Sequence, residues 1–336
     1  METKILKPNK ETFKLAAKYI NNGELVAFPT ETVYGLGADA TNDTAVKQIF
    51  TTKGRPQDNP LIVHLSNKKD IEKYILSISK TEQKIVNKFM PGPISLVLKK
   101  NNLISNVVSC NLDTIAIRIP ENKVARNFIK YTNKPICAPS ANTSKRPSPT
   151  TAKDVYQDMK DKIPLIINGG NCNIGVESTV VKCENNIVYI LRPGKITKED
   201  LEKSLKTTVI DKIPTENKKI ESPGVKYTHY CPSCDMILVK NNKLENFKNL
   251  IENYKDKNIL VLCSPNIQKE LSSYKKDNFK IEILGKNSEE ACKNIFRYLR
   301  KFEKDFDLIL AEFIENGKMQ SALYNRMIKS ASGREV

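Results

Sequence analysis

The spacing of apolar segments changes near residue 236. Beyond it, short apolar runs alternate regularly with longer amphipathic stretches of helical period. This alternation predicts repeated βαβ units, in which parallel strands carry helices on both faces of one sheet. The pattern contains no Gly-rich dinucleotide fingerprint. We therefore expect a smaller, Rossmann-like parallel α/β domain over 236–336, with strands at 236–239, 259–263, 280–284 and 308–313 and helices at 243–254, 266–274, 288–303 and 319–331.

The first 210 residues follow a less regular pattern. Strict alternation of helix and strand is lacking, so we expect an α/β domain over 1–210 with a substantial twisted mixed sheet. A chain of 336 residues is too long for one ordinary core, which supports two domains joined by the polar linker 211–235. The predicted strands cover 25–28, 61–65, 94–98, 115–119, 165–167, 179–181 and 188–191, and the predicted helices 11–21, 43–53, 68–75, 80–89, 122–131, 151–159 and 198–205.

The net charge is +17, from 55 Lys+Arg against 38 Asp+Glu. Such a balance favours anionic partners such as nucleotides, pyrophosphate or RNA, although lysines spread over solvated faces give the same total. No apolar stretch approaches the roughly 20 residues that a membrane helix needs. The N-terminus also lacks the apolar core of a signal peptide. We expect a cytoplasmic protein with no membrane partner.

The eight cysteines lie mostly in apolar contexts, which is typical of buried reduced thiols. Cys231 and Cys234 form the only close pair. A structural zinc site needs a second pair or suitably spaced histidines. A thioredoxin-like pair stands between a strand and a helix, whereas this pair ends the linker. We expect neither a metal site nor a function for it.

Lys53 and Arg55 flank a glycine where the helix 43–53 should end. Gly54 can adopt the left-handed terminating conformation, and Pro56 stops continuation of the helix. Both cations are therefore expected on an exposed exit loop, where an ammonium and a guanidinium would grip phosphate oxygens. The alternative for such a turn is an ordinary basic surface loop.

Ser140 and Asn142 alternate on an extended loop after the apolar run 136–138. Both side chains can then point into one pocket and offer neutral donors and acceptors. The alternative is a turn in which the two side chains bond their own backbone.

His64 and Arg118 are polar residues at or near the ends of predicted strands. A lone histidine in that place is more often a satisfied, partly buried residue than a catalyst. Arg118 interrupts an alternating apolar run, and a charge in a buried sheet needs an anionic partner. Either an internal carboxylate or a substrate carboxylate can supply it.

Familiar catalytic signatures are missing from the sequence. There is no Walker A pattern, no Gly-x-Ser-x-Gly elbow and no His-Glu-x-x-His zinc helix. Any ATP site must therefore be of a less common kind. With no nucleophile triad, catalysis should rest on positioning and on neutralisation of phosphate charge, assisted by Mg²⁺.

A series of short motifs occurs in one order along residues 8–210. In that order they resemble the successive motifs of YrdC-like threonylcarbamoyl-AMP synthases. The segments 222–230 and 322–331 are similar to the longer, two-domain form of that family. The motifs are Phe28-Pro-Thr-Glu-Thr-Val-Tyr-Gly-Leu36, Lys53-Gly-Arg-Pro56, Asn59-Pro-Leu-Ile-Val-His64, Pro91-Gly-Pro93, Arg118-Ile-Pro120, Ala138-Pro-Ser-Ala-Asn142, Glu177-Ser-Thr-Val180 and Leu191-Arg-Pro-Gly194.

The resemblance implies a reaction in which L-threonine, bicarbonate and ATP give threonylcarbamoyl-AMP and pyrophosphate. The threonine amine captures carbon dioxide as a carbamate, whose oxygen then attacks the α-phosphorus of ATP. Mg²⁺ would accompany ATP, and no residue is assigned to a protein metal site. Threonylcarbamoyl transferase proteins and tRNA would be the downstream partners.

The resemblance also implies roles for individual residues. Four are expected to contact the phosphates and the new mixed anhydride as the catalytic set: Lys53, Arg55, Ser140 and Asn142. Those expected to bind ATP are Arg55, Asn59, Ser140, Ser148, Arg192 and Tyr230, the last by folding over the nucleotide with the linker. Those expected to hold threonine are Thr32, His64, Arg118 and Ser178, with Arg118 on the carboxylate.

The sequence departs from the family pattern at a few positions of the linker and second domain. Val225 stands where the family commonly has Met, Cys231 where it has Ala, and Lys318-Met319 interrupts a usually Gly-rich segment. Two alternatives stand beside the synthase. A hydrogenase-maturation carbamoyltransferase would carry paired zinc-finger cysteines, which are not seen. An RNA-binding or ribosome-associated module without ATP turnover would be supported by the +17 charge.

Overall fold

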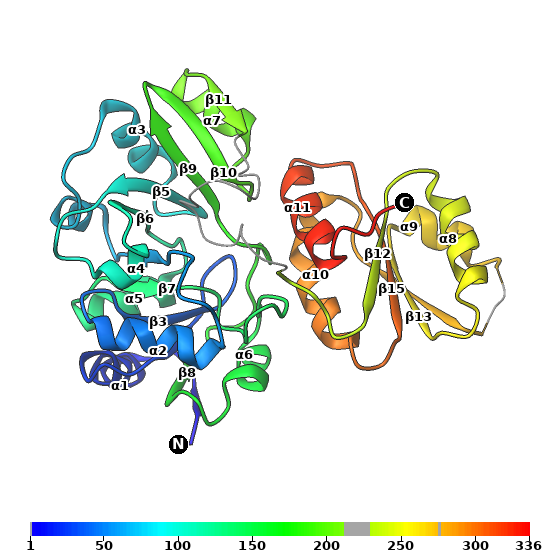
Figure 1. Ribbon diagram of the computed structural model, residues 1–336, viewed down its shortest axis with the longest axis horizontal. Coiled ribbons are helices and arrows are strands. Elements are labelled where there is room, and N and C mark those ends of the chain that lie inside the picture. The colour runs from blue at the N-terminus through cyan, green and yellow to red at the C-terminus, as the bar shows by residue number, and fades with distance from the viewer. Residues whose placement is uncertain (1, 212–228, 275–276) are drawn as a thin grey trace. The chain divides into compact units, whose positions relative to one another are not determined.

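The computed structural model describes residues 2–211, 229–274 and 277–336 (Figure 1). The chain divides into two compact units, which are described separately. Unit 1 comprises Met1–Ser144, Ser148–Asn173 and Glu177–Tyr227. Unit 2 comprises Lys145–Pro147, Ile174–Val176 and Thr228–Val336. Most of the predicted linker, 212–228, lies outside the described residues.

Unit 1 is built on one mixed sheet of eleven strands among the described residues, in the order β1-β8-β2-β3-β7-β4-β6-β5-β9-β10-β11. Strand β4 pairs parallel with β6, and β6 pairs antiparallel with β5. The predicted mixed α/β sheet is therefore confirmed. Its elements are β1 Lys4–Leu6, α1 Lys10–Asn21, β2 Val26–Phe28, β3 Gly35–Asp39, α2 Asp43–Lys53, β4 Ile62–His64, η1 Lys68–Lys73, α3 Lys80–Phe89, β5 Ile94–Lys99, α4 Asn106–Ser109, β6 Thr114–Arg118, α5 Lys123–Thr132, β7 Ile136–Ala138, α6 Ala152–Met159, β8 Leu165–Ile167, β9 Thr179–Glu184, β10 Ile187–Arg192, α7 Lys198–Leu205 and β11 Val209–Asp211.

Strand β3 lies in a segment for which the sequence pattern predicts no strand. A Cβ atom added at Gly37 would lie 2.9 Å from Cγ2 of Ile136 and 3.0 Å from the ring of Phe28. Glycine thus lets neighbouring side chains cover a strand that has little apolar character of its own. Strands β1, β7 and β11 are likewise not predicted from the sequence pattern, and the predicted helix at 68–75 is a 3₁₀ helix over Lys68–Lys73.

Helices α1 and α5 cover one face of the sheet in unit 1. The rings of Phe28 on β2 and Phe128 on α5 lie 5.1 Å apart. Phe13 and Ile20 of α1 belong to the same buried cluster as Phe28 and Phe128. This packing buries the apolar face of each amphipathic helix, which is where most helical stability in proteins comes from.

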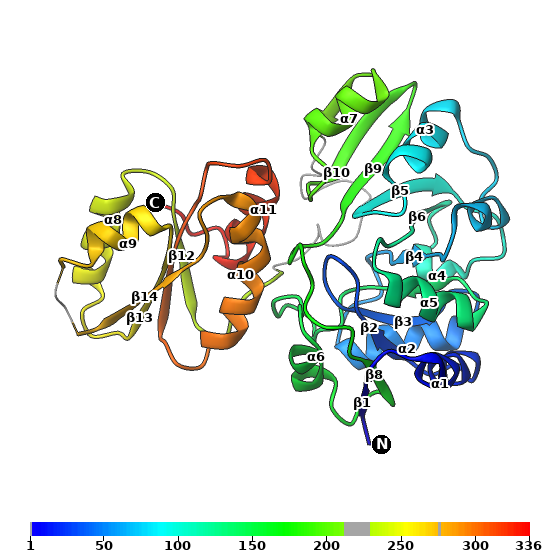
Figure 2. The same ribbon diagram turned by 180° about the vertical axis from the view of Figure 1, so that it is seen from behind.

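Unit 2 has a four-stranded sheet among its described residues, in the order β12-β15-β13-β14, and every pairing is parallel. Helices α8 and α9 cover one face and α10 and α11 the other (Figure 2). The predicted parallel α/β unit is confirmed. Its elements are β12 Asp235–Val239, α8 Lys243–Asn253, β13 Ile259–Cys263, α9 Pro265–Leu271, β14 Phe279–Ile283, α10 Ser288–Phe302, β15 Leu308–Glu312 and α11 Gln320–Ser330.

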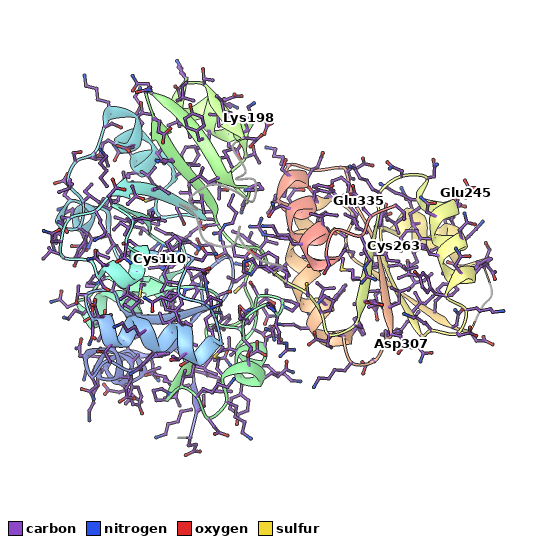
Figure 3. All side chains as sticks on the ribbon, viewed as in Figure 1. Cys110, Lys198, Glu245, Cys263, Asp307 and Glu335 are labelled. Carbon is purple, nitrogen blue, oxygen red and sulfur yellow. The ribbon has the colours of Figure 1, made fainter. Side chains whose placement is uncertain are left out.

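The cysteines are free thiols in both units, including Cys110 in unit 1 and Cys263 in the sheet of unit 2 (Figure 3). Burial raises the pKa of Cys234 to about 11, so that thiol stays protonated at neutral pH. The thiol of Cys231 lies 3.5 Å from the carbonyl oxygen of Lys329. Within the described residues, no helix combines the length and the apolar character that crossing a membrane requires.

Candidate active site

Lys53 is the last residue of α2, and Gly54 ends the helix in the left-handed conformation with φ of 60°. The predicted helix end is therefore confirmed. The Lys53 side chain, however, is not on an exposed loop: the residue is only 2% exposed. Its ammonium donates hydrogen bonds of 2.5 Å to the carbonyl oxygens of Ser140 and Asn142. The expectation of exposure is wrong because the loop after β7 folds over the helix end.

Ser140 and Asn142 lie together on that loop. The Ser140 hydroxyl donates to Oδ1 of Asn142 at 2.5 Å, and Nδ2 of Asn142 donates to the Thr143 carbonyl at 2.8 Å. The local bonding considered from the sequence is therefore present. The same residues also surround the Lys53 ammonium, so three of the four predicted catalytic residues meet in one place.

Arg55 and Asn59 form a second contact beside this group. Nη2 of Arg55 donates to the backbone carbonyl of Asn59 at 3.0 Å. Asn59 is only 1% exposed, and neither its amide nitrogen nor its amide oxygen has a hydrogen-bond partner among the described residues. A buried amide without partners is costly. It therefore points to a polar ligand at this position.

Arg118 meets both an internal carboxylate and a threonine. Its Nη2 donates to Oε1 of Glu31 at 2.6 Å, and its Nη1 donates to the Thr32 hydroxyl at 3.0 Å. Nε of Arg118 is buried and has no hydrogen-bond partner among the described residues. The sequence leaves open an internal or a substrate carboxylate, and the structure shows the internal one. The Nε edge retains a donor for a second acceptor.

His64 lies beside Arg118 because β4 and β6 are parallel and place the two residues opposite one another. The ring is 4% exposed and packs edge-on against Phe28, with centroids 5.8 Å apart. Nδ1 lies 3.1 Å from the Ile62 carbonyl oxygen, which can only accept, so Nδ1 carries the proton. Burial, with the nearby Arg118 charge, lowers the pKa of His64 to about 3. His64 is therefore neutral.

Ser178, which directly precedes β9, is hydrogen-bonded to Arg192 at the end of β10. Nη2 of Arg192 donates to the Ser178 hydroxyl and its Nε to the Ser178 carbonyl, both at 3.0 Å. The Ser178 hydroxyl lies 2.8 Å from that of Ser95, which sequence reasoning missed. The pairings of β5, β6, β9 and β10 place Ser95, Ser178 and Arg192 at the same end of the strands as Arg118.

Ser148 donates a hydrogen bond of 2.5 Å from its hydroxyl to Oε1 of Glu177. Both residues are buried. Glu31 and Glu177 are thus carboxylates that sequence reasoning missed as site residues. Each stands directly beside a predicted site residue, Thr32 and Ser178, and this adjacency was the one available signal.

Tyr230 belongs to unit 2. Its ring packs against Phe296 with centroids 4.9 Å apart, and the Arg326 guanidinium lies over it at 5.9 Å. The structure thus gives Tyr230 partners inside unit 2. Its predicted contact with ATP stays a prediction. Residues 212–228 of the linker, which was expected to fold over the nucleotide, lie outside the described residues.

The polar groups of unit 1 gather at the two ends of β4. His64 and Arg118 lie at its carboxyl end, whereas Asn59 precedes its start. Strand β7 runs antiparallel to β4, so the loop with Ser140 leaves near that start. A three-residue strand spans about 10 Å. Gly35, which follows the loop carrying Glu31 and Thr32, pairs with Ser140, so this loop connects the two groups.

Comparison with known proteins gives a consistent result over the whole chain. The family model described as "Telomere recombination" matches residues 18–194, and the model described as "Threonylcarbamoyl-AMP synthase, C-terminal domain" matches 196–332. Threonylcarbamoyl-AMP synthase from Pyrococcus abyssi is 39% identical over 332 residues, which cover 96% of this chain and 95% of the relative. Its Bacillus subtilis counterpart is 38% identical, with 98% of this chain and 96% of the relative covered.

The solved structures agree with these relatives. The crystal structure of P. abyssi Sua5 complexed with L-threonine has a TM-score of 0.91 and 37% identity, covering 100% of this chain and 98% of that chain. The structure of Escherichia coli YciO, at 18% identity and a TM-score of 0.51, covers 58% of this chain and 97% of that chain, and it supports the fold alone.

Proposed function

The chain belongs to the threonylcarbamoyl-AMP synthase family, and we propose that it converts L-threonine, bicarbonate and ATP into threonylcarbamoyl-AMP and pyrophosphate. Family membership extends over nearly the whole chain, which favours this enzyme over an RNA-binding module without ATP turnover. The observation that carries the proposal is the pair of polar groups at the two ends of β4. One group is rich in cations and amides, and the other contains a buried arginine with a spare donor.

The threonine site is proposed at the carboxyl end of β4. Nε of Arg118 would donate to the substrate carboxylate, because its two terminal nitrogens already serve Glu31 and Thr32. The neutral His64 ring would bind threonine as a hydrogen-bonding group, since a pKa of about 3 makes it a weak base at neutral pH. The hydroxyl of Ser178 is held at the same edge by Arg192.

The nucleotide site is proposed at the other end of β4. Lys53 and Arg55 would neutralise charge on the α-phosphate and the leaving pyrophosphate, with Ser140 and Asn142 fixing the mixed anhydride. Asn59 would gain partners for its buried amide. Ser148, Arg192 and Tyr230 remain proposed ATP contacts. The charges here are fixed before the reaction, so catalysis would come from positioning rather than from a nucleophile on the protein.

The reaction requires one net proton to leave. An ammonium and a bicarbonate combine into a carbamate, a water molecule and a proton, after which the carbamate oxygen attacks the α-phosphorus and pyrophosphate departs. We propose that Mg²⁺ arrives with ATP, because it is commonly held by substrate phosphates with few protein ligands. It would supply additional neutralisation of phosphate charge when it arrives with ATP.

Pyrophosphate release tests the proposal directly. The protein is incubated with ATP, Mg²⁺ and bicarbonate, with and without L-threonine, and pyrophosphate is measured. We expect release that depends on threonine and on bicarbonate. Release that is independent of threonine, or none at all, would refute the proposal. The product would be passed on to threonylcarbamoyl transferase proteins acting on tRNA, because a mixed anhydride hydrolyses readily in water.

A further inference from the structure

Glu31 is a buried carboxylate at the proposed threonine site for which no role has yet been assigned. Its side chain is 6% exposed and forms an ion pair with Arg118 at 2.6 Å. Oε2 accepts a second hydrogen bond, from the backbone nitrogen of Asn122 at 3.2 Å. Burial acts to raise the pKa of Glu31, but the charge and hydrogen bond of Arg118 lower it overall. Glu31 is therefore ionised at neutral pH.

Within the group formed by Arg118, Glu31 and His64, the charges consequently cancel. Arg118 contributes +1, Glu31 contributes −1, and His64 is neutral. A ligand that approaches Nε of Arg118 meets a buried pair with no net charge rather than a bare cation. An anion without a cationic group would leave an uncompensated negative charge in a site with little access to water, and such charges are costly. A zwitterion leaves none.

The geometry brings Glu31 close to such a ligand. Glu31 bonds Nη2 of Arg118, and the donor without a partner is Nε of the same guanidinium. A carboxylate bound at Nε would lie within about 6 Å of Glu31, a separation at which unit charges in a partly buried site change affinity by about tenfold or more. Glu31 therefore repels the ligand's carboxylate and favours a ligand that also carries an ammonium group.

We propose that Glu31 is a specificity-determining residue that makes the Arg118 site neutral, so that the site selects a zwitterionic amino acid over the corresponding hydroxy acid. The inference rests on the proposed function, because it takes threonine as the ligand of Arg118. The competing explanation is purely structural: a buried arginine needs an anion, and Glu31 supplies one. A purely structural role would alter all ligands alike, whereas a charge role changes their ratio.

The first experiment uses the unaltered protein. The KM for threonine is compared with inhibition constants for 3-hydroxybutanoate, which lacks the ammonium group, and for 1-amino-2-propanol, which lacks the carboxylate. We expect both analogues to bind at least about tenfold more weakly than threonine, because each leaves one charge uncompensated. If 3-hydroxybutanoate binds as tightly as threonine, the inference is wrong. This comparison needs no variant and stands even if substitutions at Glu31 impair folding.

The second experiment changes Glu31 itself. Glu31→Gln keeps a carbonyl acceptor for Arg118 but removes the charge, and Glu31→Asp keeps the charge. The ratio of the 3-hydroxybutanoate inhibition constant to the threonine KM should fall at least about tenfold in Glu31→Gln and hold in Glu31→Asp. The control is Glu11→Gln, which removes the carboxylate of an exposed ion pair with Lys14 at 3.1 Å. It should change neither the ratio nor the ATP KM.

The outcomes separate the inference from the function beneath it. Threonine-dependent pyrophosphate release with an unchanged ratio in Glu31→Gln refutes the inference alone and leaves a structural role. A rise of both constants by one factor refutes it in the same way. No threonine-dependent release from the unaltered protein refutes the proposed function instead. In Glu31→Gln, a lower ratio of the 3-hydroxybutanoate inhibition constant to the threonine KM, with an unchanged ATP KM, supports the charge role of Glu31.

Discussion

Replacing Lys53 with alanine should reduce both turnover and stability, whereas replacing Arg55 with alanine should reduce turnover as much and stability less. Lys53 is 2% exposed, and its ammonium holds two backbone carbonyls, those of Ser140 and Asn142, at 2.5 Å. A hydrogen bond to a charged group contributes about 1.5–3 kcal/mol, and both acceptors would lose their donor. We expect Lys53→Ala to lower the free energy of unfolding by about 3 kcal/mol.

The catalytic effect is of similar size. Losing one preorganised donor to the developing charge costs about 3 kcal/mol of transition-state stabilisation, or roughly 100-fold in kcat. Arg55 is half-buried and donates to the backbone of Asn59 from a loop. Arg55→Ala should therefore lose about as much turnover, while its free energy of unfolding falls by about 1 kcal/mol, because one partly exposed hydrogen bond is lost instead of two buried ones.

Two measurements on the same preparations separate these effects. Urea unfolding gives stability, and pyrophosphate release at saturating ATP, threonine and bicarbonate gives turnover, at a temperature where each variant is folded. Lys47→Ala is the matched control, because Lys47 is exposed on the same helix. Near-normal turnover in either folded variant would mean that the phosphates bind elsewhere. If the loss of turnover in Lys53→Ala is fully explained by the fraction of that variant that is unfolded, Lys53 has no catalytic role.

Substitutions at three residues, Arg118, His64 and Arg192, give further tests at the proposed threonine site. Arg118→Ala should raise the threonine KM much more than the ATP KM. Arg118→Lys should raise the threonine KM less than Arg118→Ala does but still above that of the unaltered protein, because an ammonium lacks the planar set of donors. Equal rises of the KM for both substrates would contradict this. For His64, the folded pKa of about 3 lies below the usual value of 6.5, so the unfolded chain takes up the proton first as pH falls. His64→Asn should therefore remove a loss of stability on the order of 2 kcal/mol between pH 6.5 and 5, measured by urea unfolding at each pH; an unchanged pH dependence would mean that His64 titrates normally. Arg192→Lys should raise the threonine KM as well as the ATP KM, because it loses the two-point contact with Ser178; a change in the ATP KM alone would mean that Ser178 needs no support.

The sequence was informative where local chemistry decides the structure. Gly54 and Pro56 predict where α2 ends, and the helix does end there, because a left-handed residue and a ring-locked residue act on the adjacent backbone. The burial of Lys53 was not predictable in the same way. It depends on carbonyl groups almost ninety residues further along the chain, and one sequence does not show which distant loop packs on a helix end.

The missed carboxylates have the same explanation. Glu31 and Arg118 are 87 positions apart, and only the folded sheet brings the loop between β2 and β3 to the end of β6. Sequence pattern indicated that Arg118 needed an anion, but it did not say which. Strand β3 was missed for a local reason. Its glycines have low strand propensity, yet they are required where Ile136 and Phe28 come within about 3 Å of the space a side chain would fill.

The length of β4 constrains how such a site would work. Its three residues span about 10 Å, with Arg118 paired to His64 at the carboxyl end and the loop with Ser140 leaving near the start. Each group is held by its own partners: Lys53 by the loop after β7, and Arg118 by Glu31 and Thr32. The two groups are also joined, because the backbone nitrogen of Ala141 donates to the carbonyl oxygen of Tyr34 at 2.9 Å. The substrates themselves would then connect the two ends, and the reaction would depend on the fixed spacing of β4 to bring the carbamate oxygen in line with the α-phosphorus. Charges held in place by their own partners need not reorganise during the reaction, and this preorganisation would take the place of a nucleophile triad, which the sequence lacks.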